Sequence, residues 1–135
     1  MLEQSKLISA LSARQFAEGL LAGLAAFDKR KITASQAQLH KAFRRVLVEA
    51  KKNQNLNVDL SDVDYDPLYG LSGWLDEFLA RAQRDLMISS PNPSYQRIEI
   101  QLTPEEGESL LSQYVDHDAI KQLSNLFFQE LQHLN

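Results

Sequence analysis

Apolar side chains recur at intervals of three and four residues in five stretches of the chain, which is the spacing of a helix with one buried face. The first stretch shows the pattern most clearly, with Phe16, Leu20, Leu24 and Phe27 on a single stripe. The predicted helices cover residues 12–28, 35–52, 72–85, 103–114 and 116–134. These segments predict a mainly α-helical protein.

A second pattern, the strict alternation of apolar and polar residues over positions 95–102, predicts a half-buried strand. The apolar run at positions 86–88 predicts the strand before it. The segment 89–94 is rich in proline, serine and asparagine, so it predicts the turn that joins the two strands into a hairpin. Ile32 and Thr33 predict a third, very short strand between the first two helices.

Two helix starts carry capping sequences. Ser35 followed by Gln38 fits a capping box, and Thr33 with Gln36 is a second candidate for the same start. The run Thr-Pro-Glu-Glu at positions 103–106 is the sharpest local signal, because threonine caps, proline suits the first helical position and acidic charge favours the N-terminus of a helix.

The order of these elements is helix, strand, helix, loop, helix, hairpin and two C-terminal helices. This order predicts an α+β fold that is mainly α with a small β-hairpin. It is also the order of a winged helix-turn-helix, in which the third helix leads directly into a two-stranded wing. We expect one domain over residues 1–135, with a winged-helix core over about 12–102 and additional C-terminal helices over 103–135.

The segment IEIQLTPEEGESLL resembles the end of the wing in MarR- and PadR-like regulators, where a strand passes into a helix that begins Leu-Thr-x-x-Gly and continues to a leucine pair. The glycine stands one position later here. The matching positions are Leu102, Thr103, Gly107, Leu110 and Leu111. The resemblance covers roughly residues 16–111 and implies a DNA-binding transcriptional regulator that acts as a dimer. Winged helices also serve as protein-interaction modules.

The composition fits one globular domain, with 135 residues of which 44% are hydrophobic and 24% are charged. The absence of cysteine excludes disulfides and thiolate chemistry and is compatible with a reducing compartment. The N-terminal segment lacks the basic and apolar regions of a signal peptide, and no apolar stretch reaches the roughly 18 residues of a membrane span. We therefore expect a cytoplasmic protein that does not engage a membrane.

The net charge of -4 gives no overall attraction to nucleic acid, so the DNA hypothesis depends on where the basic side chains lie. The candidate recognition helix offers arginine and glutamine, but Asp76 and Glu77 near its start would repel phosphate. A basic cluster lies within residues 29–52, and a solvated helix face has the same appearance. The residues predicted to contact DNA are Lys31, Lys41, Arg44, Arg45, Arg81, Gln83, Arg84 and Arg97.

An acidic and aromatic surface over residues 59–77 supports the alternative, a winged-helix protein-interaction module such as an antitoxin-like protein or a subunit of a complex. Tryptophan and tyrosine are over-represented among interface hot spots, although these rings also suit core packing. The C-terminal helix is the predicted homodimer element, and packing back on the first helix is its other interpretation. The residues predicted to contact a protein are Asp62, Asp64, Tyr65, Tyr69, Trp74, Phe127 and Phe128.

No catalytic or metal-binding pattern stands out. Counted from Asp59 as position one, the acidic run places Asp64 at the sixth position and Gly70 at the twelfth, where an EF-hand needs glycine and glutamate. The Asp-His-Asp run at 116–118 is consecutive, and adjacent residues on a helix do not converge on one ion. Neither a nucleophile elbow nor a phosphate-binding loop occurs. We expect no enzyme activity, no cofactor and no metal.

Overall fold

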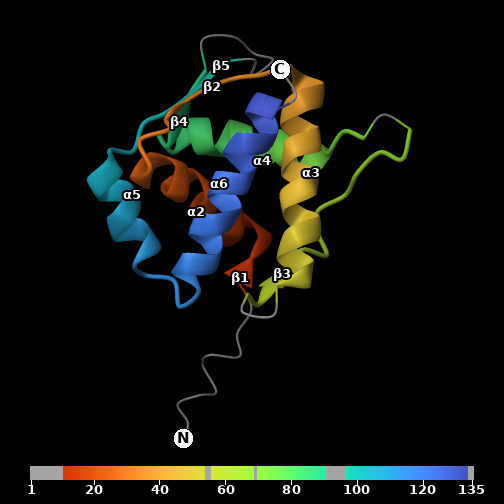
Figure 1. Cartoon of the computed structure of the whole chain (residues 1–135). Coiled ribbons are helices and arrows are strands. Elements are labelled where there is room, and N and C mark those ends of the chain that lie inside the picture. The colour runs from red at the N-terminus through yellow and green to blue at the C-terminus, as the bar shows by residue number, and fades with distance from the viewer. Residues whose placement is uncertain (1–10, 54–55, 69, 91–96, 134–135) are drawn as a thin grey trace, which may run out of the picture.

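The computed structural model describes residues 11–53, 56–68, 70–90 and 97–133, and this part of the chain is mainly helical with a small antiparallel sheet (Figure 1). The prediction of an α+β chain that is mainly α is confirmed. The helices are α2 (Ala13–Ala26), α3 (Gln36–Lys52), α4 (Gly73–Arg84), α5 (Pro104–Leu111) and α6 (His117–His133). The strands are β1 (Leu11–Ser12), β2 (Lys31–Thr33), β3 (Val58–Asp59), β4 (Ile88–Ser89) and β5 (Arg97–Ile100).

Helix α2 lies at the centre of the core, because small and apolar residues cover most of its circumference. Phe16 and Leu24 are fully buried. Gly19 and Gly23 let α6 approach closely, since a Cβ built on Gly19 would lie 3.1 Å from the Ile120 Cγ2 atom. Both α5 and α6 pack against this helix (Figure 1). The glycines therefore set the distance at which the C-terminal helices dock.

Strands β2, β5 and β4 form the antiparallel sheet in this order. The register pairs Ile32 with Ile98 and Ile88 with Ile100, and all four side chains are buried. The residues between them point to the other, exposed face. The predicted alternation is therefore confirmed over Arg97–Ile100, while residues 95 and 96 and most of the predicted turn lie outside the described residues.

A second, two-stranded parallel sheet was not predicted. It pairs Leu11 with Val58 and Ser12 with Asp59, and so ties the segment after α3 to the start of α2. Strands of two residues are too short to give an alternating pattern, and only the tertiary fold brings them together.

Helix α4 ends in a left-handed residue, so the predicted strand start at Leu86 is wrong and the strand begins at Ile88. Leu86 has a φ of 63°. Its N–H donates to the Gln83 carbonyl at 3.2 Å, and the Met87 N–H donates to the Ala82 carbonyl at 2.9 Å. This is the hydrogen-bond pattern of a Schellman helix end, a position that favours glycine because a Cβ costs about 1–2 kcal/mol there.

Replacing this leucine by glycine (Leu86→Gly) is expected to raise the free energy of unfolding by about 1 kcal/mol, because the strain disappears and the side chain is already 77% exposed. Urea denaturation would measure the change. Asp28→Gly is the matched control, since Asp28 ends α2 at a φ of 58° and aspartate tolerates this region better. A loss of stability in the Leu86 variant would show that its side chain makes a contact worth more than the strain.

Candidate functional site

A buried histidine holds the start of α4, the helix with the predicted recognition residues. The Ser72 hydroxyl caps this helix by accepting from the Leu75 N–H at 3.1 Å, and the Ser72 N–H donates to Nδ1 of His40 at 2.8 Å. Nε2 of His40 lies 3.0 Å from Oδ1 of Asp76. Because a backbone N–H can only donate, Nδ1 accepts and the Nε2–H donates to Asp76. Helix α3 therefore positions the first turn of α4 through one side chain.

Aromatic rings fill the space between α3 and α4. The Trp74 ring is parallel to Phe43 at a centroid distance of 6.1 Å and to Phe78 at 5.6 Å. Trp74 is half-buried. The contacts of Trp74 with Phe43 and Phe78 match the core-packing interpretation. Only the exposed part of the Trp74 ring can touch a partner.

Helix α4 presents both basic and acidic side chains to solvent. The exposed polar residues toward solvent are Glu77, Arg81, Gln83 and Arg84. Asp76 is engaged by His40, and Asp85, the C-cap, lies 3.5 Å from Nη2 of Arg14. Within the described part of the chain, Asp85 is the one acidic side chain of this helix and its C-cap that pairs with a cation, whereas Asp76 accepts from a neutral imidazole and keeps its negative charge. The predicted repulsion of phosphate at the start of α4 therefore rests on both Asp76 and Glu77.

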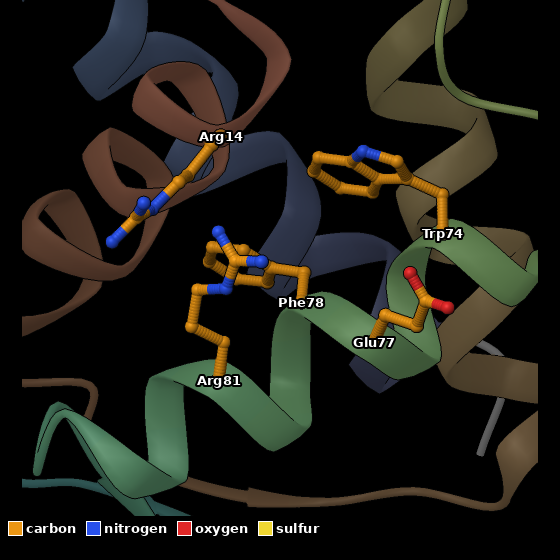
Figure 2. A pocket seen from close by; sticks show the side chains of 5 residues that line it. All are labelled: Arg14, Trp74, Glu77, Phe78 and Arg81. Atoms are coloured by element: carbon orange, nitrogen blue, oxygen red, sulfur yellow. The ribbon is translucent and has the colours of Figure 1, made fainter.

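A pocket of about 70 Å³ opens between the start of α2 and the exposed side of α4. Its lining residues are Arg14, Trp74, Glu77, Phe78 and Arg81 (Figure 2). Figure 2 shows Arg81 reaching from α4 toward α2, where Arg14 lies, whereas the Glu77 carboxylate lies on the side of the Trp74 ring. The pocket therefore has a basic side and an acidic side, with aromatic rings between them.

The predicted basic residues of α3 are exposed but partly engaged within the chain. The Arg45 guanidinium lies 3.6 Å from Glu49, and the Arg44 guanidinium carbon lies 5.4 Å from the centre of the Tyr65 ring. Lys41 is exposed and makes no ion pair with the described residues. Exposed pairs of this kind contribute about 0–1 kcal/mol, so these cations stay accessible to an anion.

Lys31 and Arg97 lie on the exposed face of the sheet, in β2 and β5. The register places Lys31 opposite Glu99 and Arg97 opposite Thr33. The structure thus brings the two predicted basic residues to one surface, with a carboxylate beside them. This surface offers less net positive charge than the two cations alone.

The predicted acidic surface is exposed, whereas Tyr65 and Trp74 of its aromatic part are half-buried. Asp62 is exposed, and Asp64 accepts a long hydrogen bond of 3.4 Å from the Trp74 N–H. The Tyr65 hydroxyl is buried and has no hydrogen-bond partner among the described residues, and this burial raises the pKa of the Tyr65 phenol. Tyr69 lies outside the described residues.

Helix α6 packs against α2 and α3, which corrects the prediction for Phe127. Phe127 is buried, and its ring meets Phe43 edge-on at 6.5 Å. Phe128 is half-buried, with the Lys29 ammonium 4.8 Å from its ring centre. A homodimer through this helix stays a prediction, and Phe128 is the one phenylalanine of the pair that a second copy can touch.

None of the helices among the described residues combines the length and the apolar character needed to cross a bilayer. In the same part of the chain, no three histidine, aspartate or glutamate side chains converge on a point that could hold a metal ion.

Comparison with protein-family models, curated proteins and solved structures found no match to this chain. Sequence reasoning missed the role of Arg14 and His40, because each looks like an ordinary polar position on a helix. Only the packing of α2 and α3 against α4 gives them their partners.

Proposed function

We propose that the chain is a winged-helix DNA-binding protein, a transcriptional regulator acting as a dimer, with α4 as the recognition helix and the β4–β5 hairpin as the wing. The topology supports this. Helix α4 is followed directly by β4, β4 pairs antiparallel with β5, and β2 pairs with the other edge of β5. The resemblance to winged-helix regulators implies the same order of elements.

The observation that carries the proposal is that the two arginines in the last turn of α4 are exposed and unpaired among the described residues. Arg81 and Arg84 are exposed and form no ion pair with the described residues, while Asp85, next to Arg84 in the chain, is paired with Arg14. Two unpaired guanidinium groups on one exposed helix suit phosphate contacts, which supply most of the affinity for DNA. Gln83 can read adenine.

One feature differs from the simplest helix-turn-helix, whose two helices are joined by a turn of about 3–4 residues. Here the connection runs from Asn53 to Ser72 and includes β3. The bond from Ser72 to His40 and the stacking of Trp74 on Phe43 hold α4 against α3 in place of a short turn. The orientation of the proposed recognition helix thus depends on side-chain contacts.

Binding to a fluorescent random-sequence DNA duplex, followed by anisotropy at several salt concentrations, tests the proposal. The wild type is expected to bind at low salt and to weaken steeply as salt rises, because phosphate neutralisation releases counterions. The double variant Arg81→Ala/Arg84→Ala is expected to bind at least about tenfold more weakly, since each lost contact is a charge-assisted hydrogen bond.

The matched control removes the same charge from α3, in the double variant Arg44→Ala/Arg45→Ala. We expect it to lose less affinity, because Arg44 and Arg45 lie on α3, outside the proposed recognition helix and wing. If the α3 variant lost binding and the α4 variant kept it, α4 would not be the recognition helix. If the wild type failed to bind even at low salt, the DNA proposal would be overturned.

A protein-interaction module is the second candidate, favoured by one observation on the loop before α4. None of its aspartates forms an ion pair within the described residues. Two hydrogen bonds from Ser61 lower the pKa of the Asp59 carboxyl. Such a surface suits a basic protein, and the absence of DNA binding by the wild type would favour it. The loop aspartates are Asp59, Asp62, Asp64 and Asp66.

A further inference from the structure

The pocket beside α4 brings together two arginines from helices that are far apart in the sequence. Arg14 belongs to the first turn of α2 and Arg81 to the third turn of α4, and both line the same opening (Figure 2). Like charges gather at low cost only where each has a carboxylate or an anionic ligand to offset it. The two arginines differ in this respect.

Arg14 is held in place by carboxylates of its own chain. Its Nε lies 3.1 Å from Oε2 of Glu18, one turn further along α2, and its Nη2 lies 3.5 Å from Oδ2 of Asp85. These contacts fix the plane of the guanidinium from two sides. Neither contact uses Nη1, so the two N–H donors of this nitrogen can still donate to a ligand. About half of the side chain is exposed, at 49%.

Arg81 has no hydrogen bond or ion pair with any described residue, although it lines the same pocket. Glu77 is four residues earlier on α4, the usual spacing for a helical ion pair. No ion pair forms between them, and Figure 2 shows the Glu77 carboxylate turned toward Trp74 instead. All five donors of the Arg81 guanidinium are therefore available to a ligand.

We propose that Arg14 and Arg81 together hold one DNA phosphate at the mouth of this pocket. This inference rests on the proposed DNA-binding function and adds a contact from α2, outside the predicted recognition helix and wing. Planar guanidinium groups match phosphate oxygens in a bidentate geometry, and two of them from different helices fix the position of the backbone as well as its charge. The contact would set the register of α4 on the duplex.

Glu77 determines which side of the pocket the phosphate takes. It lines the pocket from α4, one turn before Arg81, and Figure 2 shows its carboxylate on the side of Trp74, so a phosphate is attracted to the arginines and repelled from this end. The aromatic edges of Trp74 and Phe78 line the space between. A phosphate held at the basic side leaves Glu77 free to accept from the amino group of a cytosine.

The test measures how the logarithm of the binding constant for the same DNA duplex falls with the logarithm of the salt concentration. The slope reports about 0.9 counterions per neutralised phosphate. Variants Arg14→Ala, Arg81→Ala and the double variant are compared with Lys121→Ala. Lys121 pairs with Glu108 on the α5–α6 side of the molecule and removes the same single charge.

We expect Arg14→Ala and Arg81→Ala each to weaken binding about tenfold, while Lys121→Ala leaves both affinity and slope nearly unchanged. Because the two arginines share one phosphate, the slope of the double variant should fall by about one in total. Arg14→Lys should keep most of the slope and lose part of the affinity, because lysine keeps the positive charge but lacks the paired N–H donors of the planar guanidinium. Exposed pairs contribute little to folding, so all variants should remain folded by circular dichroism.

Three results would overturn the inference. If Arg14→Ala matched Lys121→Ala while the α4 variants lost binding, α2 would not contact DNA and the proposed function would stand. A fall of about two in the slope of the double variant would mean that Arg14 and Arg81 contact two separate phosphates and do not share one. The absence of salt-dependent binding by the wild type would overturn both the proposal that Arg14 and Arg81 share a phosphate and the proposed function.

Discussion

The Gly107→Ala variant is expected to lose about 3 kcal/mol of its free energy of unfolding. A Cβ built on Gly107 would lie 2.5 Å from the Ala22 carbonyl oxygen and 2.8 Å from the Ala26 nitrogen. Both are backbone atoms of α2, so neither can rotate away, and α5 would have to withdraw from the central helix. Overpacking costs about 1–3 kcal/mol where side chains can adjust, and backbone movement places this site at the upper end.

The sign of this effect is what makes the test informative, because alanine is otherwise about 1 kcal/mol better than glycine inside a helix. Gly73→Ala is the matched control. It lies in the first turn of α4, where an added Cβ would meet nothing within 4 Å. Urea denaturation should show a gain or no change for the Gly73 variant and a large loss for the Gly107 variant. Equal stabilities in the two would mean that α5 can move away from α2 at no cost.

Local signals gave the correct helix starts, because a capping sequence acts through hydrogen bonds between residues three apart. The box of Ser35 and Gln38 and that of Thr103 and Glu106 are both present, each with the side-chain and the backbone bond. The burial of Ile98 and Ile100 follows from the alternation of apolar and polar residues, which is also a local pattern because successive side chains of a strand point to opposite faces. Patterns of this range predict elements well and say nothing of how the elements meet.

The contacts that assemble the site connect residues far apart in the chain, so no local pattern predicts them. Gly107 lies in the first turns of a helix whose start the capping sequence predicts, yet only the structure shows that α2 occupies the space of its missing side chain. Phe127 lies on an apolar stripe that suits a dimer as well as it suits its own core, and packing against Phe43 decides between them.

The charges over α4 show the same limit of local patterns. The sequence places Asp76 and Glu77 at the start of the predicted recognition helix, where both would repel phosphate. In the structure, Asp76 accepts from His40 and Asp85 lies beside Arg14. The potential over α4 depends on these partners, which belong to α2 and α3. A sequence count therefore measures how many charges a surface holds but not which of them face a ligand.

The His40→Ala variant is expected to lose about 3 kcal/mol of its free energy of unfolding. His40 is 1% exposed. Its removal leaves a cavity and leaves the Ser72 N–H buried without an acceptor, and an unsatisfied buried donor alone costs about 1–3 kcal/mol. The Asp76 carboxylate loses its donor as well, at smaller cost because that side chain is 47% exposed. The loss should be visible in thermal and urea denaturation.

Asparagine separates the hydrogen bond from the cavity, because its amide oxygen lies where Nδ1 of His40 accepts from Ser72. His40→Asn should therefore recover about half of the loss. Equal losses in the alanine and asparagine variants would show that the Ser72 bond contributes nothing. The same pair also reports on α4. Under conditions where both variants are folded, a recognition helix that depends on His40 for its position should bind DNA more weakly in the alanine variant than in the asparagine variant. Unchanged DNA affinity in both would mean that Trp74 and the sheet hold α4 without this contact.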